Sequence, residues 1–258
     1  MIPPGVRLVT EQAVPGELPL WTHPEWSGRF DWLAQGITSA GTAAAPFDLG
    51  LFGANPVGEA IGRWRLLREA LGFPAVAHSR QVHAARVLVH PHRPPEGLLV
   101  TDGYDAHLTA ARGLLLTASV ADCVPVSIVD GEGRAIAVVH AGWRGVVAGI
   151  TEAAIALLGS GHGLAPASLW LHCGPSICGE CYEVGPEVHR AVHPERESPA
   201  EPTPIDLRAA LAERAVAAGL LPERISVSTH CTLCGDGGFF SHRGGSPGRQ
   251  MAFVGMRE

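Results

Sequence analysis

Three apolar runs between residues 113 and 140 constrain this fold more than any other feature of the sequence. Residues 113–120, 125–129 and 134–140 are short, apolar and bounded by turn residues, which is typical of buried β-strands. Asp130-Gly131-Glu132-Gly133 separates the last two runs and predicts a hairpin turn. The centre of the fold is therefore expected to be a β-sheet.

Helices and further strands are expected on both sides of this region. Apolar residues at helical spacing predict a helix over residues 57–71, which Gly72 ends with Pro74 beyond it. Strands outnumber helices, and hairpins mix with crossover connections, which favours an α+β or mixed α/β fold. The other expected helices are 145–158, 186–192 and 205–218, and the other expected strands are 6–10, 30–37, 75–90, 169–173, 224–228 and 251–254.

Composition limits the functions open to the chain. Its 258 residues, 46% of them hydrophobic, can bury a sizeable core, as one large domain or two small ones. All 19 basic residues are Arg, so no lysine is available as a nucleophile, a Schiff base or a phosphate-loop residue. A net charge of −6 without a basic run gives no reason to expect nucleic-acid binding, although Arg can hold small anions.

The sequence gives no signal for export or for membrane insertion. Residues 1–5 lack the regions of a signal peptide, and no apolar stretch approaches the ~18 residues that span a membrane. We therefore expect a cytoplasmic protein with no membrane partner. Six Cys in that compartment are expected to be thiols or metal ligands and not a disulfide framework. No pattern indicates an oligomeric state.

Two His and one Cys are the main candidates for chemistry. Cys123 and His140 each lie at the end of an apolar run beside a turn, and His83 follows Arg-Gln-Val beside another apolar run. Zinc accepts such a set in catalytic sites and leaves its fourth position open. Asp122 could hydrogen-bond a ligating imidazole, and Arg144 with the following helix N-terminus could hold an anion. The competing interpretation is a buried Cys and two ordinary polar His.

The remaining cysteines leave two interpretations open. Cys178-Gly-Glu-Cys181 and Cys231-Thr-Leu-Cys234 could together form a four-thiolate zinc site. However, 49 residues separate the two pairs, against about 15–20 in a compact zinc ribbon. A redox pair would need a helix N-terminus in a thioredoxin-like setting. No role is predicted for Cys173.

A short aromatic and basic cluster, Phe239-Phe240-Ser241-His242-Arg243, precedes two glycines. It is either a strand end that packs two Phe into the core, or a stacking floor with an Arg for an anion. The sequence does not separate these interpretations.

Six motifs in order make the chain recognisable. It resembles the YfiH-like, laccase-domain family, whose members carry the names polyphenol oxidase and multicopper oxidoreductase and are read as purine nucleoside phosphorylases with adenosine deaminase activity. The resemblance runs from about residue 75 to the C-terminus. The motifs are Arg-Gln-Val-His (80–83), Ala-Asp-Cys-Val-Pro-Val (121–126), His-Ala-Gly-Trp-Arg-Gly (140–145), Gly-Pro-Ser-Ile-Cys (174–178), Cys-Tyr-Glu-Val-Gly (181–185) and Phe-Phe-Ser-His-Arg (239–243).

The resemblance implies a single α+β domain over residues 1–258, with mixed β-sheets layered with helices. It implies one zinc on His83, Cys123 and His140, the set reached above from ligand chemistry, and these residues are also the predicted catalytic groups. The implied partners are a small-molecule nucleoside and phosphate. The predicted substrate-binding residues are Gln81, Asp122, Arg144, Phe240, Ser241 and Arg243; the two Arg would contact phosphate or sugar, and Phe240 with Ser241 would line the base pocket.

Several positions depart from the family pattern. The expected Thr-Thr-Arg-x-Gly-Gly segment is Ile-Thr-Ser-Ala-Gly at residues 37–41, so its Arg is missing. Ala84 replaces the Gly after the first His, His242 replaces Tyr, and Arg243 is followed by Gly and not by a second Arg. Reduced or altered phosphorolysis is therefore plausible.

Four functions follow. The first is a zinc enzyme that cleaves purine nucleosides with phosphate and deaminates adenosine with an activated water. The second is a copper polyphenol oxidase, which ranks lower because only three Met are present and a multicopper enzyme needs many more His. The third is a metal-free hydrolase with Cys123 as nucleophile and His140 or His83 as base. The fourth is an accessory protein with a degenerate site.

Overall fold

Two seven-stranded mixed β-sheets lie face to face in the computed structural model, which describes residues 1–53 and 55–258. The first sheet has the order β1 (Arg7–Val9), β17 (Ile225–Ser228), β14 (Leu169–Cys173), β12 (Val124–Asp130), β13 (Ile136–Ala141), β10 (Ala106–Thr109), β8 (Val87–His90). The second has the order β2 (Gln12–Ala13), β3 (Leu20–Thr22), β4 (Leu33–Thr38), β18 (Gln250–Met256), β11 (Leu114–Val120), β7 (Ala75–Arg80), β9 (Gly97–Asp102).

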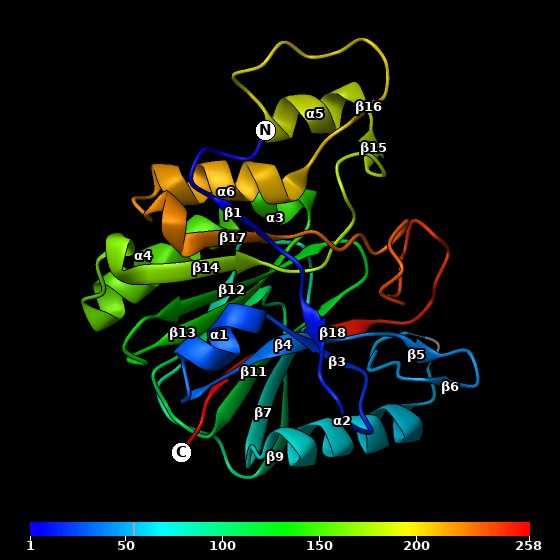
Figure 1. Cartoon of the computed structure of the whole chain (residues 1–258), viewed down its shortest axis with the longest axis vertical. Helices are drawn as coiled ribbons and strands as arrows, with labels where there is room; N and C mark the ends of the chain where they lie inside the picture. Colours follow the sequence, from blue (N-terminus) through cyan, green and yellow to red (C-terminus); the bar gives the residue numbers. More distant parts are fainter. Residues whose placement is uncertain (54) are drawn as a thin grey trace.

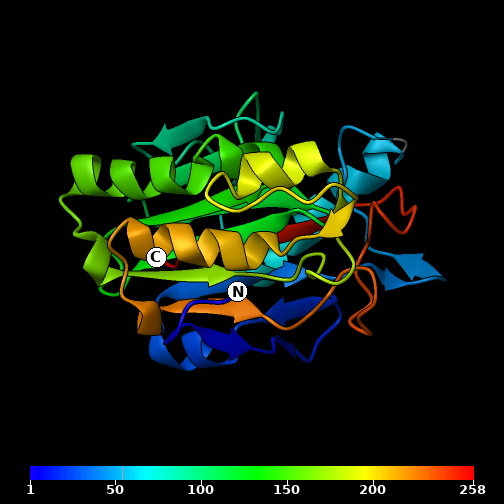
Figure 2. The ribbon, with the colours of Figure 1, turned by 90° about the horizontal axis from the view of Figure 1, so that it is seen from above.

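Helices cover the outer faces of both sheets (Figure 1). The first sheet is covered by α3 (Trp143–Val147), α4 (Ile150–His162), α5 (Pro186–Val192) and α6 (Leu207–Ala217), which Figure 2 shows from above. The second is covered by α2 (Val57–Leu71). The smaller elements are α1 (Pro24–Arg29), the 3₁₀ turns Pro166–Ser168 and Pro222–Arg224, and the pairs β5 (Gly41–Thr42) with β6 (Ala45–Pro46) and β15 (Glu183–Val184) with β16 (Thr203–Pro204). None of the described helices is long and apolar enough to cross a membrane.

The layering explains why the central strands are apolar throughout. In β11, Leu114 and Leu116 face the first sheet, whereas Leu115 between them packs in the core under α2. In β13, Val138 packs between the sheets and Val139 packs under the helices. Because successive side chains of a strand point to opposite faces, a strand covered on both sides needs an apolar residue at every position. The three strands predicted between residues 113 and 140 are thus confirmed, as is the α+β layered fold.

Two predicted elements are each divided in the structure. Residues 75–90 are not one strand: β7 joins the second sheet, β8 joins the first, and residues 81–86 cross between them. Residues 145–158 do not form one helix either, because Gly149, at φ 76°, separates α3 from α4. Helix α4 continues through Gly159 and ends at His162, and Gly163 after it is left-handed at φ 66°. The helix at 57–71 is confirmed, and Gly72 ends it at φ 72°.

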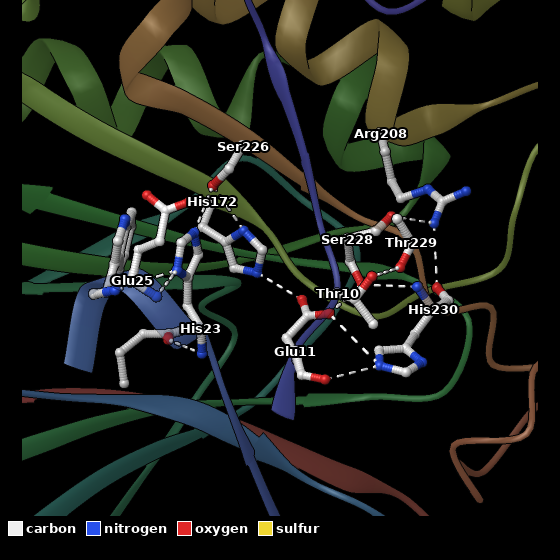
Figure 3. A network of polar contacts seen from close by, with 12 residues as sticks. Thr10, Glu11, His23, Glu25, His172, Arg208, Ser226, Ser228, Thr229 and His230 are labelled. Carbon is white, nitrogen blue, oxygen red and sulfur yellow. Dashed lines mark hydrogen bonds and ion pairs between the residues drawn. The ribbon is translucent and has the colours of Figure 1, made fainter. Parts of the chain in front are cut away.

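A buried polar network ties the N-terminal segment to the first sheet (Figure 3). The Glu11 carboxylate accepts hydrogen bonds from His172 Nε2 at 2.8 Å and from Ser228 Oγ at 2.7 Å. Ser226 Oγ lies 2.9 Å from His172 Nδ1 and 3.2 Å from His23 Nε2. All five side chains are buried. Their polar atoms pair with one another, which offsets the cost of removing them from water.

Candidate metal centre and active site

The fold brings together three side chains that are distant in the sequence. Cys123 directly precedes β12, and the pairing of Pro125 with His140 in β13 places the histidine beside it. His83 arrives from the crossing between the two sheets. The candidate ligand atoms of the three residues lie within 4.8 Å of one another, and Cys123 Sγ is 3.9 Å from His83 Nε2. We call these residues the His–Cys–His triad.

Asp105 organises this triad from behind. Its side chain is buried in the turn before β10 and accepts a hydrogen bond from His140 Nδ1 at 2.9 Å. It also accepts the backbone N–H groups of His83 and Ala84 at 2.9 Å each, and that of Val82 at 3.3 Å. The bond at Nδ1 leaves His140 Nε2 to face the triad, which is how a carboxylate orients a metal-binding imidazole.

Asp122 does not have the role that the sequence suggested for it. Its carboxylate accepts a hydrogen bond from Thr232 Oγ1 and another from the backbone N–H of Arg243, both at 2.6 Å. Among the described residues it is Asp105 that hydrogen-bonds the His140 imidazole. Asp122 instead ties Cys123, its neighbour in the chain, to the loop after β17.

Backbone strain is concentrated at the triad. His83 at φ 58° and Asp122 at φ 83° are the two non-glycine residues with positive φ in the described part of the chain. Such conformations cost energy and persist where the surroundings hold them, often at functional sites. Asp105 holds the first through three N–H groups, and Thr232 with Arg243 holds the second.

The electrostatics of the triad favour a thiolate. Burial raises the pKa of Cys123, but the charge and hydrogen bonds of His140, with a contribution from His83, outweigh burial and lower this pKa to about 6. Burial lowers the pKa of His140, whereas Cys123 and Asp105 raise it to about 9. The thiolate is the form of cysteine that binds metals and acts as a nucleophile.

The donor set fits a zinc ion. A tetrahedral zinc with Zn–S near 2.3 Å and Zn–N near 2.05 Å separates sulfur and nitrogen by about 3.5 Å, close to the 3.9 Å between Cys123 and His83. His83 is exposed, Cys123 half-buried and His140 buried, so the triad opens to solvent on one side. Three protein ligands with an open side are the arrangement of catalytic zinc sites.

The triad lies at a cavity of about 350 Å³, in the size range of small-molecule sites. Gln81, a predicted substrate-binding residue, also lines it, and its side-chain amide makes hydrogen bonds of 2.8 and 2.7 Å with the backbone of Ser119. Several other lining residues are not among the site residues predicted from the sequence: Asp48, Phe52, Asn55, His78, Arg80 and Arg249. The residue before Gln-Val-His is Arg80, so the motif itself could have indicated this one.

The other predicted substrate-binding residues do not line this cavity in the described structure. Arg144 stacks on Trp143 at 4.4 Å, and Arg243 stacks on Tyr182 at 5.4 Å. Burial raises the pKa of Tyr182, and the charges of Cys123, Arg243 and Arg144 also act on it.

Phe240 and Ser241 are held by the loop that carries them. The backbone N–H of Phe240 donates to Gln250 Oε1 at 2.6 Å, and the buried Ser241 Oγ accepts the N–H of Gly244 at 2.9 Å. His242, the neighbour that departs from the family pattern, does line the cavity. The roles of Phe240 and Ser241 in binding a base stay predictions.

Known proteins resemble this chain over most of its length. Purine nucleoside phosphorylase YlmD of Geobacillus stearothermophilus is 32% identical over 86% of this chain and 90% of its own, and the crystal structure of YlmD from that organism superposes with a TM-score of 0.86, at 28% identity, over 97% of this chain and 100% of that one. Adenosine deaminase RL5, from an unknown prokaryotic organism, is 36% identical over 64% of this chain and 68% of its own. The crystal structure of Bacillus licheniformis YfiH shares the fold, with a TM-score of 0.85 at 23% identity over 93% of this chain and 97% of that one.

These names support an enzymatic, purine-nucleoside-processing function for the family. The sequence profile described as "Multi-copper polyphenol oxidoreductase laccase" matches residues 44–257. The resemblance seen in the six motifs is thereby confirmed, and the chain belongs to this laccase-domain family.

Proposed function

We propose that this protein is a zinc-dependent enzyme of purine nucleosides, which cleaves adenosine-, inosine- and guanosine-type nucleosides with phosphate and deaminates adenosine. The observation that carries the proposal is the His–Cys–His triad at a cavity of small-molecule size. The names of YlmD and adenosine deaminase RL5 support the substrate class.

His83, Cys123 and His140 would hold the metal. A zinc ion in such a site supplies Lewis acidity and activates water. The protein's own contribution is to preset the ligands: Asp105 fixes the free nitrogen of His140 and the backbone at His83, and the low pKa of Cys123 provides the thiolate.

The cavity walls offer groups for each part of a nucleoside and for phosphate. Phe52 provides an aromatic surface for a base, and Asn55 provides polar groups for a sugar. Arg80 and Arg249 line the same cavity and can attract phosphate; Arg80 is itself paired with Asp102 at 2.8 Å. These Arg would supply cationic groups on the cavity side even though the family's N-terminal Arg is missing.

Arg144 and Arg243, which do not line the cavity in the described structure, are the phosphate or sugar contacts predicted from the sequence. Substituting one Arg of each pair distinguishes the cavity-lining Arg80 and Arg249 from Arg144 and Arg243. If the cavity set binds phosphate, Arg249→Ala raises the KM for phosphate and Arg144→Ala does not. The reverse result would return the role to the residues predicted from the sequence.

The deciding experiment measures metal content together with turnover. Purified wild type and Cys123→Ala are analysed for metals and assayed with adenosine and inosine, with and without phosphate, by following base release and ammonia. We expect wild type to bind zinc at the triad and turn over nucleoside, and Cys123→Ala to lose both that zinc and the activity. Zinc at the triad without turnover would contradict the proposed substrate class.

The lowered pKa of Cys123 favours one alternative, a metal-free enzyme with Cys123 as nucleophile and His140 as base. Metal-free wild type that still turns over nucleoside would establish it. A copper oxidase is tested in the same preparation, by copper content and by oxidation of a phenol with and without EDTA.

A further inference from the structure

A second sulfur-rich cluster lies outside the catalytic cavity. Cys178 and Cys181 follow β14, and Cys231 and Cys234 follow β17, its parallel neighbour in the first sheet. Parallel neighbours end at the same edge of a sheet, so the two C-x-x-C turns meet there although 49 residues separate them in the sequence. We call them the four-cysteine cluster.

The four sulfur atoms are spaced for a single metal ion. All four lie within 4.8 Å of one another, and Cys178 Sγ is 3.9 Å from Cys234 Sγ. A tetrahedral zinc with Zn–S near 2.3 Å places its sulfurs about 3.8 Å apart. A disulfide would hold two sulfurs at about 2.05 Å, and all six Cys are free thiols here. Four sulfurs so close together leave no room for a multi-iron cluster between them.

The backbone is arranged to receive a thiolate. Cys231 Sγ accepts the N–H groups of Cys178 at 3.3 Å, Leu233 at 3.4 Å and Cys234 at 3.4 Å. Three N–H groups directed at one sulfur favour its anionic, metal-binding form. Gly235 closes the second turn: its N–H donates to the Cys231 carbonyl, and a Cβ there would lie 2.4 Å from that oxygen.

Contacts on either side fix the two turns to each other. Ser176 and Cys231 form a parallel bridge, and Thr232 N–H donates to the Ser176 carbonyl at 3.1 Å. Arg208 holds the chain that leads into the second turn: its guanidinium donates to the carbonyls of Ser228 at 2.9 Å and His230 at 3.2 Å (Figure 3). The ligand geometry is thus set by the fold and needs no movement of either loop.

We propose that Cys178, Cys181, Cys231 and Cys234 bind a structural zinc ion, separate from the His–Cys–His triad. Four protein thiolates leave no open position, so this ion stabilises the structure and does not take part in chemistry. It clips the loop after β14 to the loop after β17. Both loops hold Asp122, through Ile177 N–H at 3.1 Å to its carbonyl and through Thr232 Oγ1 at 2.6 Å to its carboxylate.

The test is zinc stoichiometry by mass spectrometry of purified variants, with no need for a substrate. We expect two zinc ions per chain in wild type, one in Cys234→Ser, one in Cys123→Ala and none in the double variant. Cys234→His should restore the second ion, because zinc accepts a Cys₃His set. Cys173→Ala, which removes a buried cysteine outside both groups, is the matched control and should keep two.

A second measurement keeps the test valid if a cysteine variant fails to fold. X-ray absorption of Cys123→Ala, in which the triad lacks its thiolate, should show one zinc with four sulfur ligands at about 2.3 Å. Unchanged zinc content in Cys234→Ser, iron in place of zinc, or disulfides among the four cysteines in fresh wild type would each overturn the proposal. Failure of nucleoside turnover alone would count only against the proposed function.

Discussion

Asp105 is a supporting residue of the triad that no sequence pattern indicates. It supports His140 through its side chain and His83 through its backbone. In Asp105→Asn the amide NH₂ must face at least one N–H donor, so the triad loses its fixed orientation. We expect zinc affinity at the triad to fall 10- to 100-fold, the usual effect of losing such a partner. Chelator competition measures it.

The control for this substitution is Glu195→Gln, which also removes a carboxylate charge but at an exposed position paired with Arg196. It should leave zinc affinity unchanged. Equal affinity in wild type and Asp105→Asn would show that Asp105 does not position the ligands.

Gly142 tests the triad by shape alone. A Cβ at this position would lie 2.9 Å from His83 Cδ2 and 3.0 Å from Cys123 Sγ. Its φ of −78° suits alanine, so the added methyl group disturbs the two ligands and not the backbone. We expect Gly142→Ala to lower zinc affinity at the triad at least tenfold, as measured by chelator competition.

Gly62→Ala is the matched control, because Gly62 lies inside α2 with open space at its Cβ position. It should leave zinc binding alone and stabilise the fold by about 0.5–1 kcal/mol. Full zinc affinity in Gly142→Ala would mean that His83 and Cys123 can shift away from the added methyl group without weaker zinc binding.

At the residue scale, the sequence predicts ligands better than it predicts their supports. His83, Cys123 and His140 were identified because strand ends beside turns expose soft ligands in a recognisable pattern. Asp105 was missed because its link to His83 spans 22 residues and two sheets. The predicted hydrogen bond from Asp122 to a ligating imidazole depends only on its position next to Cys123 in the chain.

At the scale of elements, apolar runs predict strands but not the sheet that each strand joins. Residues 75–90 look continuous, yet the hydrogen bonds of β7 and β8 lead to different sheets. The division matters for function, because the crossing between them carries His83. The strands β9 and β10 were missed, and Gly149 was not recognised as a helix break because glycine also occurs inside helices, as Gly159 does in α4.

Asp206 caps the N-terminus of α6, and its contribution to stability can be measured. Asp206 accepts the N–H groups of Arg208 at 2.9 Å and Ala209 at 3.3 Å. Asp206→Ala should lower the free energy of unfolding by about 1–2 kcal/mol, as loss of a helix cap does. Denaturant titration measures it.

Asp206→Asn separates capping from charge, since Asn caps helices equally well. It should recover most of the loss. If both substitutions cost the same, the ion pair between Asp206 and Arg208 is the main contribution and not the cap.

For the whole molecule, buried neutral histidines predict acid sensitivity. Burial lowers the pKa of His23 and of His78 to about 3. At pH values below about 6.5, the pKa of histidine in an unfolded chain, the unfolded protein binds protons at these two positions, whereas the folded protein keeps both imidazoles neutral. Each histidine therefore lowers the free energy of unfolding by about 1.4 kcal/mol per pH unit as pH falls from 6.5 toward 3. Denaturant titrations at pH 7, 6 and 5 measure this slope.

His23→Asn should reduce that slope by about one histidine's contribution, because Asn does not titrate and still caps α1. His92→Asn, at an exposed position, is the control and should leave the slope as in wild type. An identical slope in His23→Asn and wild type would show that His23 protonates in the folded state.

Strand order in the second sheet has a consequence for synthesis on the ribosome. The strand β18 lies in the middle of this sheet, where it pairs with β4 on one side and with β11 on the other. Because β18 follows both partners in the chain, β4 and β11 have an unpaired edge until it is translated. Exposed strand edges invite pairing with other chains. Premature termination just before residue 250 should therefore yield aggregates and not a smaller native-like protein.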